Sequence, residues 1–327
     1  MMIPLSILEL GRVRQGSDRR TALDDARSVA QHAERLGFRR IWVAEHHNSP
    51  AVSTAATSVV LSHIAAGTTT IRVGAGGVML PNHAPYVIAE HFGTLETLYP
   101  GRIDLGLGRA PGTDQVTLGA LRRNPDNAEN FPQDVLELQA FLAPKGETQR
   151  IEAVPGSGTN VPLWILGSSL FGAQLAAALG LPYAFGSQFS PQLLHQALEV
   201  YRTNFQPSEQ LQKPYALIGV NVIAAETDVE ARVLATSQQM TFADMFRGMP
   251  SLLKPPIEDI EAYWRPEEKA QAERMLSCSV VGSAETVRNG LNQLVADTKA
   301  DELLIVSDIY DLDKRVRSLE ITIQTAI

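Results

Sequence analysis

The chain has 327 residues, of which 44% are hydrophobic, so it is long enough to bury a large core as one αβ barrel or as two ordinary domains. A net charge of −8 and a pI near 5.4 argue against a nucleic-acid surface, which needs a basic stripe. The single cysteine, Cys278, excludes an internal disulfide and a thiolate zinc cluster, and no apolar run approaches the roughly 18 residues that span a bilayer. With neither a basic region nor a cleavable apolar segment at the N-terminus, we expect a cytoplasmic protein that acts on a small molecule.

Short apolar runs alternate with longer segments of helical period, which is the pattern of a parallel sheet with crossover helices. In chain order, we expect strands over residues 3–8, 40–44, 70–76, 102–107, 163–166, 182–186, 215–224 and 302–306. We expect helices over residues 20–36, 53–66, 85–98, 131–142, 169–179, 191–204, a segment ending near 239, 284–298 and 312–324. Eight strands that each lead into a helix favour a closed barrel over an open sheet.

Two stretches interrupt this alternation. Residues 109–162 are rich in glycine, proline and asparagine, and residues 241–277 are irregular, with Gly248 and several prolines. No linker suggests a domain boundary. The sequence therefore predicts an α/β fold, a single TIM-type (β/α)8 barrel domain over residues 1–327 with insertions after strand 4 and strand 7.

The run 41–48 contains a glutamate and two histidines where the second strand should end. In such barrels the active site lies at this end of the strands. Adjacent residues of an extended chain point to opposite faces, so His46 and His47 cannot both face the barrel mouth. One of them is a candidate general base, and a rim histidine hydrogen-bonded to a neighbouring loop is the alternative. The usual His-x-x-x-His spacing is missing and no other cluster of ligands is evident, so we expect no metal site. The role of Glu45 stays open.

Two glycine-rich stretches, 73–77 and 106–112, follow expected strands. Neither fits a dinucleotide fingerprint, because extended chain follows the first and Pro111 interrupts the second. Two alternatives remain. The glycines leave space for a flat ring against the backbone, or they form a bulge or a tight barrel corner.

Small residues also lie between the fifth strand and its helix, over 166–172. Free backbone N–H groups at a helix start form an anion site that suits a phosphate, although Ser168 or Ser169 can equally be a simple N-cap. Arg109, just past the fourth strand, is placed either to contact the same anion or to pair with an acid such as Asp114.

Together these segments resemble the bacterial luciferase-like flavin monooxygenase family, in its branch of uncharacterised single-chain oxidoreductases, over essentially the whole chain. The most specific motifs span residues 42–48, 78–85, 98–112 and 164–169. The resemblance implies a TIM barrel that binds FMN as FMNH2, supplied by a separate reductase, and oxygenates a small organic substrate with O2. It also implies a homodimer.

The resemblance carries roles to individual residues. His46 matches the catalytic base, the Gly76–Gly77 bond matches a non-proline cis peptide that supports the flavin ring, and Arg109 matches a phosphate-binding position. Gly167, Ser168 and Ser169 match the rest of the phosphate site, and His47 and His83 are rim or substrate-contact candidates.

Gly108 replaces a reactive cysteine of the light-emitting members, so bioluminescence is not implied. The segment 241–277 falls where the family keeps a mobile lid. A deazaflavin (F420)-dependent hydride-transfer enzyme and a non-catalytic flavin-binding protein are the alternatives.

Overall fold

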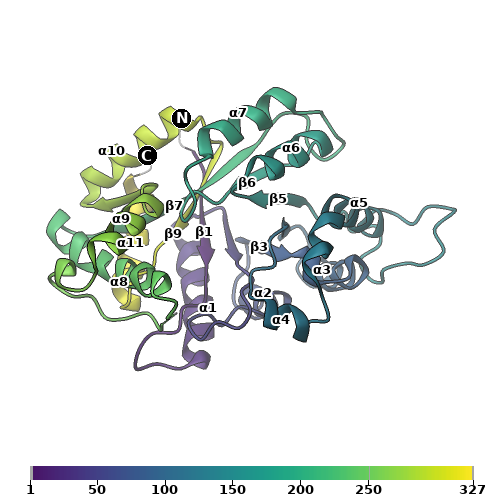
Figure 1. The fold of residues 1–327 in the computed structure, drawn as a ribbon. Helices are drawn as coiled ribbons and strands as arrows, with labels where there is room; N and C mark the ends of the chain where they lie inside the picture. Colours follow the sequence, from purple (N-terminus) through teal and green to yellow (C-terminus); the bar gives the residue numbers. More distant parts are fainter. Residues whose placement is uncertain (1–2, 250, 326–327) are drawn as a thin grey trace.

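The structure is a computed structural model that describes residues 3–249 and 251–325. Its strands form one parallel sheet in which eight strands close into a barrel, because β6 pairs with β7 and completes the ring. Helices surround these strands (Figure 1). The barrel strands are β1 (Leu5–Glu9), β2 (Arg40–Val43), β3 (Arg72–Met79), β4 (Ile103–Gly108), β5 (Leu163–Gly167), β6 (Tyr183–Phe185), β7 (Ala216–Ala224) and β9 (Glu302–Val306). The predicted TIM barrel is confirmed, and every expected strand is present.

The α-helices follow the predicted order, with three differences. They are α1 (Arg19–Leu36), α2 (Thr57–Ala65), α3 (Pro85–Leu98), α4 (Gln115–Ala120), α5 (Phe131–Leu142), α6 (Leu170–Leu179), α7 (Leu194–Asn204), α8 (Asp228–Phe246), α9 (Pro266–Met275), α10 (Ala284–Thr298) and α11 (Leu312–Thr325). Short 3-10 turns are η1 (Leu80–Asn82), η2 (Pro125–Asn130) and η3 (Ile260–Ala262). Sequence periodicity missed α4, which has six residues, and α9, which is mostly polar, because neither has a continuous apolar stripe. It also ended α8 too early, although residues 240–246 are largely apolar.

A ninth strand, β8 (Ser279–Gly282), was also missed. It pairs with residues 221–224 of β7, on the edge that β6 leaves after residue 218. A nine-residue strand beside a three-residue one would leave backbone groups without partners, and β8 supplies them. β8 forms because β7 is longer than β6, and the four residues of β8 carry no information about that length.

A buried charge network closes the N-terminal end of the barrel. Arg40 Nη1 lies 2.7 Å from Asp104 Oδ2, and Arg40 Nε lies 2.8 Å from Glu302 Oε1. Above this layer, Trp42 packs edge-on against Trp164, with 5.0 Å between ring centroids. The lower barrel is therefore filled with side chains.

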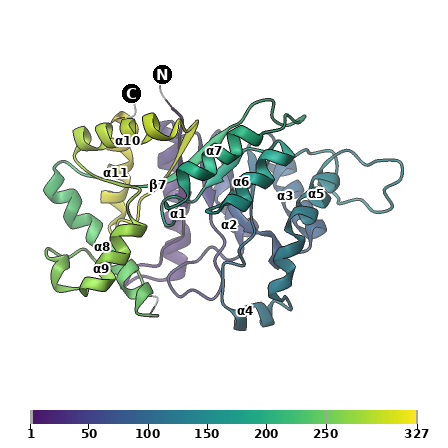
Figure 2. The ribbon, with the colours of Figure 1, turned by 45° about the horizontal axis from the view of Figure 1, so that its top comes forward.

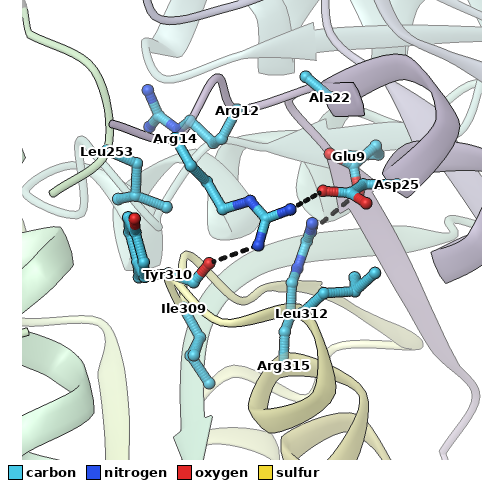
Figure 3. A pocket seen from close by; sticks show the side chains of 10 residues that line it. All are labelled: Glu9, Arg12, Arg14, Ala22, Asp25, Leu253, Ile309, Tyr310, Leu312 and Arg315. Carbon is cyan, nitrogen blue, oxygen red and sulfur yellow. Dashed lines mark hydrogen bonds and ion pairs between the residues drawn. The ribbon is translucent and has the colours of Figure 1, made fainter. Parts of the chain in front are cut away.

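Three segments at the C-terminal end are tied together by Arg14, in the loop after β1. Figure 3 shows its guanidinium between Asp25 of α1 and the backbone oxygen of Tyr310, with distances of 2.7 and 3.3 Å. Leu253, which follows α8, accepts a hydrogen bond from Gln15 N–H and donates one to the Val13 oxygen. The cavity enclosed here is about 20 Å3, which is room for a water molecule and not for a cofactor.

The insertion after β4 runs in two parts. Its first part carries α4 and α5, and its second part, residues 143–162, includes a loop that extends away from the barrel in both views (Figures 1 and 2). None of the helices in the described ranges has the length and hydropathy needed to cross a membrane.

Candidate active site

His46 lies just past the end of β2, at the C-terminal end of the barrel. Its ring is exposed, and it has no hydrogen-bond partner within the described chain. The surrounding protein nevertheless lowers the pKa of His46 to about 4, chiefly by desolvation and then by the positive charge of Arg12. His46 is therefore accessible to solvent, while the protein around it disfavours the charged form of its ring. The imidazole is neutral at pH 7 and is able to accept a proton.

Glu45 is the centre of a second group of side chains. Its carboxylate is buried, and Oε1 lies 2.8 Å from His47 Nε2 and 2.9 Å from His83 Nε2. The backbone N–H of Met79 donates to Oε2 at 3.3 Å. Burial alone would raise the pKa of Glu45, but the hydrogen bonds from the two histidines outweigh it and the pKa is lowered. The hydrogen bond to Glu45 in turn raises the pKa of His47.

This arrangement separates the two adjacent histidines. His47 turns toward Glu45, whereas His46 is left free of side-chain partners in the described residues. It also corrects the expectation that no cluster of metal-type ligands exists, because Glu45, His47 and His83 bring one donor atom each to within 4.8 Å of one another. His83 follows the neighbouring strand, 38 residues along the chain from Glu45. The alternation of an extended chain could have predicted that Glu45 and His47 lie on one face. Nothing in the sequence could have predicted that His83 joins them, because the fold brings it there.

The Gly76–Gly77 peptide bond is cis. The pairing of β3 with β4 shifts register between Ala75 and Val78, so these glycines form a bulge, as one of the two alternatives predicted. A Cβ on Gly76 would lie 2.9 Å from Trp42 Cβ, and one on Gly77 would lie 2.7 Å from the Gly106 oxygen. Packing inside the barrel therefore requires both glycines, whatever ligand the bulge supports.

Arg109 follows β4 and lies against the start of α6. Its guanidinium is 4.1 Å from the ring centroid of Phe171 and has no ion pair in residues 3–249 and 251–325. The alternative partner, Asp114, instead accepts a hydrogen bond from Asn48 and caps α4. The exposed Arg109 is thus directed to the helix start and not to an acid.

The start of α6 has unused hydrogen-bond donors. Ser169 occupies the N-cap position, but its side chain makes no capping bond, so it is not the simple cap that the sequence also allowed. A Cβ on Gly167 would meet only Gly172 Cα, at 3.8 Å, which leaves this turn open. Open backbone N–H groups, two serine hydroxyls and one guanidinium fit a phosphate dianion.

Comparison with known proteins decides the family. The model for luciferase-like monooxygenases matches residues 3–302. The chain belongs to the luciferase-like monooxygenase family. It is 48% identical to a luciferase-like monooxygenase of Escherichia coli strain K12, over 98% of this chain and 96% of the relative.

Solved structures agree with the fold. Apo-MsnO8 superposes with a TM-score of 0.89 at 33% identity, over 99% of this chain and 98% of that one. The oxygenating constituent of 3,6-diketocamphane monooxygenase from Pseudomonas putida, solved with FMN, has a TM-score of 0.72 at 18% identity, over 98% and 96% of the two chains. As a member of the luciferase-like monooxygenase family, the protein is an enzyme of the oxidoreductase class.

Position 108 is closely packed. Gly108 is buried, and a Cβ there would lie 2.9 Å from Met79 Sδ. A cysteine at 108 would have to displace Met79. The local packing is built around the absence of that side chain.

The segment 241–277 is only partly irregular: it includes the end of α8 and all of α9, whereas residues 251–265 have η3 as their one regular element. Asp244, near the end of α8, accepts hydrogen bonds from Lys254 at 2.6 Å and from the Tyr263 hydroxyl at 2.6 Å. Arg247 pairs with Glu268 of α9 at 2.6 Å. These ion pairs and α9 give the segment a structure of its own beside the barrel mouth.

Proposed function

We propose that this protein is an FMN-dependent monooxygenase that receives reduced FMN from a separate reductase and transfers one oxygen atom from O2 to a small organic substrate. One observation carries the proposal. A neutral, accessible histidine and an open anion site occupy the same end of one barrel, at His46 and at the Arg109–α6 junction. This is the end at which TIM-barrel enzymes hold their ligands.

Different residues would hold the phosphate and the ring of FMN. Arg109, Gly167, Ser168 and Ser169 would hold the phosphate, because they provide one cation and several unused donors. The bulge at Gly76–Gly77 would support the flavin ring. The reduced flavin, when bound, supplies the electrons that activate O2.

The chain's own chemistry is proton transfer. His46, with its pKa lowered to about 4, holds an unprotonated ring nitrogen at neutral pH and accepts a proton from the reacting group. The Glu45 carboxylate keeps the neighbouring His47 turned away, so that a single histidine meets the substrate. His47 and His83 contribute to the rim next to it.

Two related proteins support the choice of flavin and reaction. The 3,6-diketocamphane monooxygenase constituent was solved in complex with FMN, and the Escherichia coli relative is named a luciferase-like monooxygenase. We also propose that the enzyme is a homodimer, since two-fold dimers are the commonest soluble oligomers. We further propose that it acts in the cytoplasm.

The test compares cofactors and then follows oxygen. Purified protein is titrated anaerobically with FMN, FMNH2 and F420, with quenching of its tryptophan fluorescence as the readout. Protein loaded with FMNH2 is next mixed with 18O2 and a metabolite pool, and products are identified by mass spectrometry. We expect tight FMNH2 binding and one 18O atom in a defined product. Binding of F420 alone would establish the hydride-transfer alternative, and FMN binding with no oxygenated product would favour a non-catalytic flavoprotein.

A further inference from the structure

We propose that Glu45, His47 and His83 form a binding site for one divalent transition-metal ion of the Zn2+ class. The two histidines and the carboxylate converge from two different parts of the chain, the turn after β2 and the residue that follows η1. In residues 3–249 and 251–325, this is the one group of at least three such side chains with all donor atoms within 4.8 Å of each other. The site does not depend on flavin binding.

The ligand set suits such an ion. Two imidazole nitrogens and one carboxylate oxygen are a common zinc set that leaves a further position for water or an anion. Zinc–ligand bonds of about 2.1 Å in a tetrahedron place the donor atoms about 3.4 Å apart. The two Glu45–histidine distances are 2.8 and 2.9 Å, so each ring would move by about half an ångström to admit the ion.

The surroundings hold these ligands in place. Glu45 is 1% exposed, and the Met79 N–H group fixes its second oxygen. The His47 N–H donates to the Gly112 oxygen and the His83 N–H donates to the Leu80 oxygen, so both histidine backbones are anchored. The side chains of His47 and His83 are 15% and 27% exposed, which gives an ion a route from solvent. Groups that orient the ligands in this way strengthen metal binding.

Binding balances in charge and protons. Without an ion, the two Nε2 atoms share one carboxylate as hydrogen-bond donors. When the ion binds, each ring gives up its Nε2 proton and keeps one proton on Nδ1. A cationic ring releases the Nε2 proton to solvent, and a neutral ring exchanges it through solvent for a proton on Nδ1. One carboxylate leaves a net charge of +1 on the centre. Because His46 is next to both Glu45 and His47 in the chain, the ion would hold the turn that presents His46.

The experiment measures metal binding directly, on tag-free full-length protein treated with a chelator and freed of flavin. Zn2+ is titrated by calorimetry at pH 7.5, and Co2+ is added separately to record its visible absorption. We expect one Zn2+ per chain and a Co2+ spectrum of low coordination number. His83→Gln should weaken Zn2+ binding by more than about 100-fold, because it keeps a donor for Glu45 but removes a nitrogen ligand. His195→Gln is the matched control, since His195 is exposed and far from the cluster in sequence, and its binding should match wild type.

The melting temperature gives a second measurement. Zn2+ should raise it in the wild type and in His195→Gln but not in His83→Gln. Absence of stoichiometric Zn2+ binding to the folded wild-type chain would overturn the proposal, and so would equal binding by a folded His83→Gln variant. Either result would leave the cluster as a carboxylate-bridged pair of histidines. Neither readout uses turnover, so this proposal and the proposed function fail independently.

Discussion

The guanidinium of Arg109 lies over the aromatic ring of Phe171, with 4.1 Å between Cζ and the ring centroid. Arg109 directly follows β4, and Phe171 lies in the first turn of α6. The contact therefore joins the ends of two neighbouring strands, β4 and β5, where each leads into its helix. An exposed arginine held in this way is already oriented toward the helix start before any anion arrives. Pre-orientation reduces the entropy lost on binding.

Arg109→Ala should weaken FMN binding by about 1.5–3 kcal/mol, which is roughly 10- to 150-fold in Kd, because a charge-assisted contact to the phosphate is lost. Phe171→Leu should have a smaller effect, about 0.5–1 kcal/mol, since it removes only the orienting contact. Fluorescence titration measures both. Arg150→Ala, in the segment that extends away from the barrel, is the control and should bind FMN as wild type does. Equal affinity in Arg109→Ala would remove Arg109 from the phosphate site.

His46→Ala should retain FMN binding but lower turnover by about 100- to 10,000-fold, the range for loss of a general base. His195→Ala, an exposed histidine on α7, should leave turnover unchanged. The measurement is kcat with the identified substrate. Turnover in His46→Ala within twofold of wild type would assign the base to another residue.

The pH dependence of activity should place the essential base well below the ordinary histidine range. The pKa of His46 is lowered from 6.5 to about 4, so the ring stays neutral as pH falls from 7 to 5 and activity is kept. The unfolded chain binds a proton at this histidine below pH 6.5 that the folded chain does not. The free energy of unfolding should therefore decrease as pH is lowered from about 6.5 to 4. His46→Asn should make this decrease smaller, as measured by chemical denaturation at each pH. A kinetic pKa near 6.5 that persists in folded protein would contradict the assignment.

Glu45→Gln should lower stability most at pH 5–6.5 in metal-free protein. His47 has a raised pKa in the folded state, so the stability that it gains from Glu45 is fully present below 6.5 and is lost as pH rises through the folded pKa. Glu45 has a lowered pKa, so its share is lost as pH falls through that value. Melting temperatures of wild type and variant across pH 4–9 measure the difference, with exposed Glu199→Gln as control. A difference that does not change with pH would show that no charge on His47 is involved.

Asp104→Ala should destabilise the fold by about 3–5 kcal/mol, because Arg40 would keep a buried charge with one partner fewer. Urea denaturation measures the change. Asp297→Ala, on the exposed face of α10, should stay within about 0.5 kcal/mol of wild type. The folded fraction of Asp104→Ala should bind FMN normally, because Asp104 lies at the opposite end of the barrel from the candidate site. Impaired FMN binding by that folded fraction would show that the two ends are coupled.

Regular elements and individual positions were predictable to different degrees. The eight barrel strands and the helices between most of them were evident, because long periodic segments reflect burial directly. The bulge at 76–77 and the open start of α6 were each one of two alternatives, since glycine and serine suit both a binding surface and tight packing. Helices α4 and α9 and strand β8 were missed, because each depends on neighbours that lie elsewhere in the chain.

The sequence by itself determined the alternation of strands and helices, the closed barrel that follows from it, and the opposite directions of His46 and His47. The alternation and the opposite directions of the two histidines are local properties, encoded by residues within one short segment of chain. Only the tertiary structure decided that His83 joins Glu45 and His47, that Arg109 turns to Phe171 and not to Asp114, and that Trp42 requires the glycines of β3. Each of these relationships joins residues from different strands or loops. Closing the barrel sets their distances, which no spacing along the chain specifies.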